Sequence, residues 1–168
     1  MADERFQPRR ILETLVERGV DFVLIGGMAG TARGSAYVTL DIDVAYERSH
    51  ENLERLAAAL TELHVILRGA PPNVPFRLDP QTLSEGANFT FDTQFGPLDV
   101  LGDVPGAPPY EALKRGAGRP LDVEGAPIYV ASLDHLIAMK EAAGRPKDLL
   151  QASEYRVISD ILRARPGE

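Results

Sequence analysis

The stretch LIGGMAGTARGSAYVTLDIDVAY, residues 24–46, decides the fold that we expect for this chain. Its last part, Leu40 to Tyr46, is typical of a buried strand, but it contains Asp41 and Asp43. Aspartate is depleted in strands. Alternate residues of a strand point to the same face, so the two carboxylates are neighbours and repel each other unless a positive charge lies between them. Alone, such a pair is mostly a solvated strand face, and the alternative is a face that binds a cation.

A glycine pair precedes this strand. Gly26 and Gly27 end the short apolar strand DFVLIGG and open a helical segment that we expect from about Met28 to Arg33. Backbone N–H groups without side chains around them, together with the positive end of a helix, can face an incoming phosphate. Alone, such a turn is more often only a close packing point. Followed by the aspartate pair, it indicates a phosphate site beside a cation site.

A third carboxylate, Asp99, lies in PLDVL, a later strand that could be a sheet neighbour of the first. Three carboxylates on one face of a sheet form a site of hard oxygen ligands, which suits Mg²⁺, with Mn²⁺ as the alternative. Two such ions can hold the attacking and leaving oxygens of a phosphoryl transfer. Other glycine-rich phosphate motifs are excluded, since GGMAG lacks the dinucleotide-binding spacing and no Lys-Ser or Lys-Thr pair forms a P-loop.

The composition limits the class of protein. The chain has 168 residues, of which 44% are hydrophobic and 26% charged, with no cysteine and a net charge of −7. We expect a single domain over residues 1–168, without disulfides, thiolate metal sites or thiol nucleophiles. The first residues lack a signal peptide and no apolar run could span a membrane, so a cytoplasmic location is expected. The acidic balance argues against broad nucleic-acid binding.

The pattern along the chain alternates between helices and strands. Expected helices cover residues 6–19, 50–63 after Ser49, 108–117, and two segments that begin at Ser132 and at about Pro146. Expected strands cover 21–27, 40–46 and 64–69, with hairpins at 87–93/96–102 and 120–125/126–131. The proline-rich residues 69–82 are expected to form a surface loop. These elements predict an α+β fold built on a mixed β-sheet.

One lysine has an unusual position. In the helix after Ser132, the apolar stripe contains Leu133, Leu136 and Ile137, and Lys140 lies on the same stripe. A lysine on a buried stripe is rare unless it is paired. Its stem could run along the edge of the core with the ammonium group in water. Alternatively, the ammonium group lies near a triphosphate or is a partner of the acidic site.

With these motifs together, the chain resembles small bacterial nucleotidyltransferases of the DNA polymerase β superfamily, in the branch similar to abortive-infection toxins and minimal nucleotidyltransferases. The resemblance extends over about residues 20–151 and includes VASLDHLIAMKEAAGRPKDLLQ, which is similar to the family's C-terminal lysine helix. It implies a mixed sheet with flanking helices and a C-terminal helical pair. Two departures are Tyr37, where many relatives have arginine, and Gln151, where relatives often have an acid.

The resemblance also implies an activity and a site. A Mg²⁺- or Mn²⁺-dependent enzyme of this kind transfers an NMP from an NTP such as ATP. The metal ligands implied are Asp41, Asp43 and Asp99, which together with Lys140 would be catalytic. The residues implied to bind the nucleotide are Gly26, Gly27, Arg33 (in the place of the missing arginine), Thr39 and Lys140.

The acceptor of the NMP stays open at this point. It could be RNA such as a tRNA end, a protein hydroxyl, or a small molecule such as an aminoglycoside. The toxin-like resemblance also allows an antitoxin-like protein partner. A different class of protein is a binding or regulatory module that keeps the fold without turnover and pairs with a second protein. The intact set of three carboxylates argues against that class, because clustered acids without a function destabilise a fold.

Overall fold

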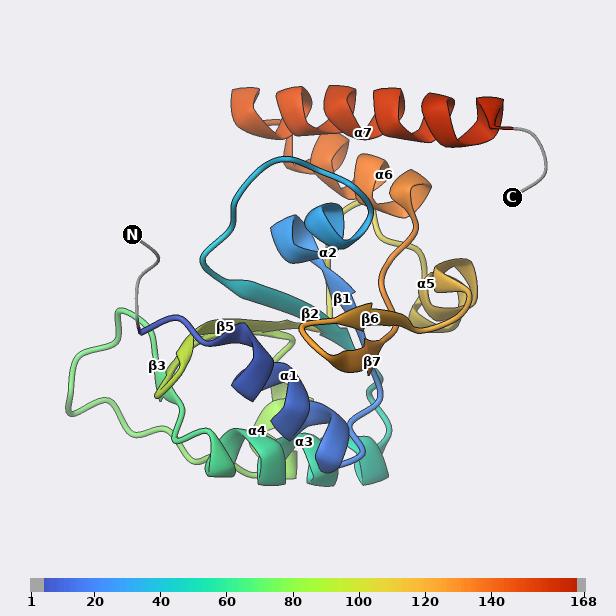
Figure 1. Cartoon of the computed structure of the whole chain (residues 1–168). Helices are drawn as coiled ribbons and strands as arrows, with labels where there is room; N and C mark the ends of the chain where they lie inside the picture. Colours follow the sequence, from blue (N-terminus) through green and yellow to red (C-terminus); the bar gives the residue numbers. More distant parts are fainter. Residues whose placement is uncertain (1–4, 166–168) are drawn as a thin grey trace.

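The computed structural model describes residues 5–165 and shows a central sheet with helices on both sides (Figure 1). The helices are α1 (Pro8–Glu17), α2 (Gly26–Ala32), α3 (His50–Glu62), α4 (Pro80–Glu85), α5 (Tyr110–Ala117), α6 (Leu133–Ala143) and α7 (Pro146–Ala164). The strands are β1 (Phe22–Ile25), β2 (Ile42–Tyr46), β3 (Ile66–Leu67), β4 (Asn88–Thr93), β5 (Gly96–Leu101), β6 (Leu121–Val123) and β7 (Ala126–Ile128). Within residues 5–165, no helix combines the length and the apolar character that crossing a bilayer requires.

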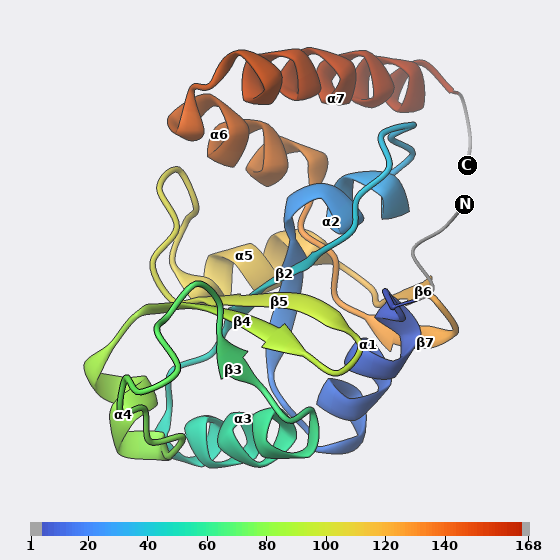
Figure 2. The same cartoon turned by 90° about the vertical axis from the view of Figure 1, so that its left-hand side faces the viewer.

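The main sheet is mixed. Its five strands lie in the order β1-β2-β5-β4-β3, and β2 and β5 run parallel while the other neighbours are antiparallel. The strands β6 and β7 form a separate two-stranded sheet. The helices α1, α3 and α4 lie below the main sheet, while α2, α6 and α7 are stacked above it (Figures 1 and 2). This α+β arrangement confirms the predicted mixed sheet with flanking helices and a C-terminal helical pair.

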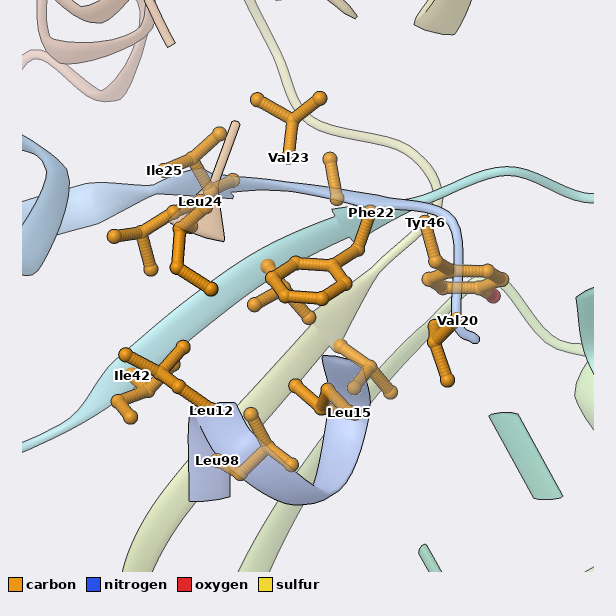
Figure 3. Packing of buried hydrophobic residues seen from close by; sticks show 14 of the residues in the cluster. Leu12, Leu15, Val20, Phe22, Val23, Leu24, Ile25, Ile42, Tyr46 and Leu98 are labelled. Carbon is orange, nitrogen blue, oxygen red and sulfur yellow. The ribbon is translucent and has the colours of Figure 1, made fainter. Parts of the chain in front are cut away.

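The hydrophobic core extends on both sides of the sheet, and a large part of it lies below. Leu12 and Leu15 of α1 lie beneath the strands and face Ile42 and Leu98, whereas Val23 points to the opposite side (Figure 3). The predicted stripe of α3 is also buried: Leu53, Leu56, Leu60 and Leu63 are at most 2% exposed. Because strand residues alternate between faces, burying Ile42, Val44 and Leu98 below the sheet places the residues between them above it.

The C-terminal helices close the upper layer. Ser132 caps α6 by accepting a hydrogen bond from the backbone N–H of His135, and Gly144 ends the helix with a left-handed backbone. The next helix, α7, begins at Pro146 as predicted and crosses above α6 and α2 (Figure 2). A proline in the first turn is favourable, since its missing N–H would have had no helical partner.

Several predicted element boundaries differ from those of the structure. Leu40 does not belong to a buried strand, because β2 begins at Ile42 and the Leu40 side chain is 56% exposed. The first helix after the glycines begins at Gly26 rather than Met28. The predicted loop 69–82 contains the start of α4, where Asp79 caps the helix by accepting from the N–H of Thr82.

Candidate active site

Strand pairing brings the predicted carboxylates together. In the parallel register of β2 and β5, Asp43 lies directly beside Asp99, and Asp41 stands immediately before β2. All three side chains are half-buried, and one oxygen of each lies within 4.8 Å of the others. The core side chains of both strands point down, so the carboxylates lie on the upper face of the sheet, toward α2 and α6.

The Gly26 turn is built against this cluster. Gly26 has a φ of +71°, and a Cβ atom on it would lie only 2.1 Å from Oδ2 of Asp43. Both the backbone angle and the available space therefore require glycine at this position. Gly27 has an ordinary φ, and a Cβ there would lie 3.0 Å from the Cβ of Thr39. The predicted glycine pair and Thr39 thus lie directly beside the aspartates.

The segment between α2 and β2 is tied to its surroundings by hydroxyl groups. Thr39 donates a hydrogen bond from Oγ1 to Oδ1 of Asp41 at 2.8 Å. Thr31 donates to the carbonyl oxygens of both Gly27 and Tyr37. These bonds hold the glycine turn and the first aspartate in a fixed relation, which a site for a large polar ligand requires.

Burial and repulsion change the acidity of the central carboxyl group. Burial, followed by the negative charges of Asp41 and Asp99, raises the pKa of Asp43 to about 7. The positive charge of Lys140 acts in the opposite direction on the pKa of Asp43. A bound cation would remove the repulsion, so the apo site is electrostatically prepared for one.

This raised pKa predicts a pH dependence of stability. Between pH values of about 4 and 7, the folded protein holds a proton on Asp43 that the unfolded chain has lost. The contribution of Asp43 to the free energy of unfolding therefore falls as the pH rises through this window and is constant above it. In the Asp43→Asn variant this contribution is absent. Urea unfolding in EDTA at pH 5, 6, 7 and 8 should show the wild type losing stability relative to the variant up to about pH 7. Parallel profiles would contradict the assignment.

Lys140 acts on the aspartate cluster through its charge and has a carboxylate partner of its own. Its side chain is 17% exposed, and Nζ lies 3.5 Å from Oδ1 of the fully buried Asp148. Arg145 donates to the other oxygen of Asp148 at 2.6 Å, and this hydrogen bond holds the pKa of Asp148 below its usual range. Lys140 is therefore paired with Asp148 and is near enough to the aspartate cluster for its charge to lower the pKa of Asp43.

The side chain of Arg33 is hydrogen-bonded to backbone carbonyl groups. Its guanidinium donates to the backbone carbonyl oxygens of Ala117, Val130 and Ala131 at 3.0, 2.6 and 3.2 Å. These bonds tie the end of α2 to the last residue of α5 and to the segment after β7, and they occupy Nε and Nη2 of the guanidinium. The binding of the nucleotide by Arg33 therefore stays a prediction. Tyr37, which stands where many relatives have arginine, is 47% exposed on the loop before β2.

One residue at the site was not predicted from the sequence. Arg68 directly follows β3, and its Nη2 lies 2.9 Å from Oδ1 of Asp99. In the sequence, Arg68 lies within the predicted strand 64–69, and nothing in that segment indicated a contact with Asp99. Only the pairing of β3 with β4, and of β4 with β5, brings Arg68 to the third carboxylate.

The donor set fits a hard divalent cation. Three carboxylates with oxygens within 4.8 Å of one another offer the ligands that Mg²⁺ and Mn²⁺ prefer. In addition, Oδ1 of Asp99 is buried, and it forms an ion pair with Nη2 of Arg68 at 2.9 Å. A buried carboxylate oxygen in that state is suited to a further positive partner.

With this sheet, its flanking helices and its C-terminal helical pair, the chain has the nucleotidyltransferase fold. It is similar to the solution structure of the antibiotic-resistance factor ANT(2'')-Ia (18% identity, TM-score 0.54), with 93% of this chain and 89% of that chain covered. It is also similar to the crystal structure of ANT(2'')-Ia in complex with adenylyl-2''-tobramycin (19% identity, TM-score 0.52; 94% and 95% covered). A third similar structure is a candidate nucleotidyltransferase from Thermotoga maritima (17% identity, TM-score 0.51; 95% and 96% covered). No protein-family model and no curated protein matches the sequence.

Proposed function

We propose that this protein is a metal-dependent nucleotidyltransferase, which transfers an NMP from an NTP to a hydroxyl group of an acceptor. One observation carries this proposal. Oxygens of Asp41, Asp43 and Asp99 gather within 4.8 Å on the sheet face, and Asp43 touches a turn where only glycine fits. The similar structures support the proposal through their shared fold, with more than nine tenths of this chain covered.

The roles of the residues follow from their positions. The half-buried backbone at Gly26 and Gly27 would receive the triphosphate, and Asp41, Asp43 and Asp99 would hold Mg²⁺ beside it. When bound, the metal would neutralise charge on the phosphates and promote ionisation of the attacking hydroxyl group. Lys140 would contribute a further positive charge on the α6 side. Asp99, on the strand farther from the glycine turn, would accept the proton of the acceptor hydroxyl.

The reaction that this site would support is an in-line displacement at the α-phosphorus. The acceptor oxygen forms a bond to that phosphorus, the bond to the β-phosphate oxygen breaks, and pyrophosphate leaves. The chain supplies positioning and charge complementarity rather than a covalent nucleophile. The net charge of −7 favours a neutral or cationic small molecule as acceptor. The complex of ANT(2'')-Ia with adenylyl-2''-tobramycin is a precedent on the same fold.

The proposal is tested with radioactive nucleotides. The purified chain is incubated with each of the four NTPs, labelled at the α-phosphate or at the γ-phosphate, with Mg²⁺ and a bacterial extract. We expect α-label, and not γ-label, to enter an acceptor in the small-molecule fraction and transfer to stop in EDTA. Alpha-label in RNA or in protein would keep the reaction but replace the small molecule as acceptor. Transfer of the γ-label, or no transfer with any NTP in any fraction, would contradict nucleotidyl transfer.

A further inference from the structure

A row of polar side chains crosses the upper face of the sheet beyond the aspartate cluster. Asp43 lies beside Asp99 in β5, and Asp99 lies opposite Thr90 in β4. The backbone N–H of Arg68 then donates to the carbonyl oxygen of Thr90 at 2.9 Å. The strands β5, β4 and β3 lie side by side in this order (Figure 2). Arg68 is therefore aligned with the cluster at the edge of the sheet.

The guanidinium of Arg68 is fixed by two hydrogen bonds. Nε donates to Oδ1 of Asp92 at 3.1 Å, and Nη2 donates to the carbonyl oxygen of Phe91 at 2.6 Å. The same Nη2 lies 2.9 Å from Oδ1 of Asp99, in a pair whose side chains are only 34% and 17% exposed. An arginine held at two points presents its remaining surface in one orientation, which a flexible lysine would not do.

We propose that Arg68 is a positioning residue, which holds the third carboxylate in the orientation that binds the metal. The carboxylate of Asp99 is close both to the two other carboxylates, with oxygens within 4.8 Å, and to the guanidinium of Arg68, at 2.9 Å. Without Arg68, repulsion from Asp43 and Asp41 would turn the Asp99 side chain away from the cluster. With Arg68 in place, that repulsion is balanced while one face of Asp99 stays open toward the other aspartates. The link to catalysis depends on the proposed function, but the link to metal binding does not.

A simpler interpretation is that Arg68 only stabilises the sheet edge through Asp92. A partly exposed ion pair of that kind contributes little to stability and would not affect metal binding. A second alternative is that Arg68 only competes with the metal as a positive charge. Its removal would then strengthen cation binding. In a variant without the guanidinium, the sheet-edge interpretation predicts unchanged metal binding and the competing interpretation predicts tighter binding. The positioning interpretation predicts weaker binding.

The test measures Mn²⁺ binding directly, through the electron paramagnetic resonance signal of free Mn²⁺, in the absence of nucleotide. The variants are Arg68→Met, which removes the charge, and Arg68→Lys, which keeps the charge but not the planar guanidinium with its several N–H donors. The matched control is Arg48→Met. Arg48 also makes several hydrogen bonds, to Tyr46, Ser84 and Gly86, and is not near the aspartates in the pairing of the sheet.

We expect Arg68→Met to weaken Mn²⁺ binding on the order of tenfold, as loss of a group that orients a metal ligand does. Arg68→Lys should recover part of this loss, and Arg48→Met should bind Mn²⁺ as the wild type does. Unchanged or tighter binding in Arg68→Met overturns the proposal, as does a wild type that binds no Mn²⁺. Urea unfolding of each variant confirms that Mn²⁺ binding is compared between folded proteins.

Turnover gives the second measurement. If the chain transfers nucleotides, kcat of Arg68→Met should fall by at least about tenfold while KM for the NTP changes little, since Arg68 lies away from the glycine turn. Equal kcat values would overturn the positioning role in catalysis. A wild type that binds Mn²⁺ but transfers nothing would contradict the proposed function alone, and the Mn²⁺ titration would still decide the role of Arg68.

Discussion

The Asp43→Asn variant is expected to lose nucleotidyl transfer while its metal-free form becomes more stable than the wild type. Asp43 is the central carboxylate, with Asp41 two residues before it and Asp99 beside it in the next strand. Asparagine keeps the shape of the side chain and can still offer an oxygen, but it has no negative charge to hold a divalent cation. We expect transfer to fall at least about a thousandfold, because both the metal and the charge complementarity are affected.

The gain in stability has the same physical origin. Burial and two neighbouring carboxylates disfavour the ionised form of Asp43, so removing its charge relieves a cost in the apo protein. At pH 8 in EDTA, we expect an increase of about 1 kcal/mol or more in the free energy of unfolding, or roughly 2–4 °C in Tm for a chain of this size. Added Mg²⁺ and NTP should raise the Tm of the wild type but not that of Asp43→Asn.

The control for charge is Asp103→Asn, which removes the same charge from an exposed position after β5. This variant should retain transfer and gain no comparable stability. If both variants transferred nucleotide equally, the aspartate cluster would not be the active site. If Asp43→Asn lost stability instead, the repulsion that explains its raised pKa would be wrongly assigned.

The candidate site was predictable to the extent that it depends on local spacing. Two aspartates two residues apart must share a face of an extended chain, and glycines between a strand and a helix indicate close approach. Which strand pairs with which is a tertiary property. The parallel register that sets Asp43 beside Asp99 depends on burying Ile42 and Leu98 together over α1, and the sequence only allowed this pairing.

The errors have physical reasons too. The apolar side chain of Leu40 favours a strand, although the chain turns out toward solvent there and only Ile42 reaches the sheet. The helix α4 had a local signal, an Asp79 cap followed by Pro80, which the many prolines of the preceding loop concealed.

The two arginines show a further limit of local patterns. Arg33 is near the glycine turn in the sequence, whereas Arg68 is near Asp99 in space. Their partners are backbone carbonyls and carboxylates from distant segments, so no local pattern separates one role from the other.

Gly26→Ala is expected to damage both stability and transfer, and to do so more severely than the same replacement at Gly19 or Gly27. Two costs combine at Gly26: a φ of +71°, which disfavours any residue with a Cβ, and a Cβ position 2.1 Å from Oδ2 of Asp43. Asp43 cannot simply rotate away, because Asp99 and Asp41 lie beside it. We expect a loss of about 2–4 kcal/mol in the free energy of unfolding.

Two control variants separate these costs. Gly19→Ala has nearly the same φ, +70°, but its Cβ would lie at an ordinary 3.5 Å from the side chain of Arg55, so it should cost only about 1–2 kcal/mol and leave transfer intact. Gly27→Ala has an ordinary φ and a tighter neighbour, Thr39 at 3.0 Å, and its helix-forming gain should offset most of that contact.

The decisive comparison is the transfer rate of the folded proteins. In Gly26→Ala, the added Cβ should displace Asp43 by up to about one ångström. We expect this shift to lower the transfer rate of the folded variant on the order of a hundredfold. Urea unfolding and the α-label assay, performed on Gly26→Ala and Gly19→Ala side by side, measure both quantities. Equal transfer rates in the two variants would mean that the close approach of Gly26 to Asp43 is packing alone, and that the triphosphate does not bind at this turn.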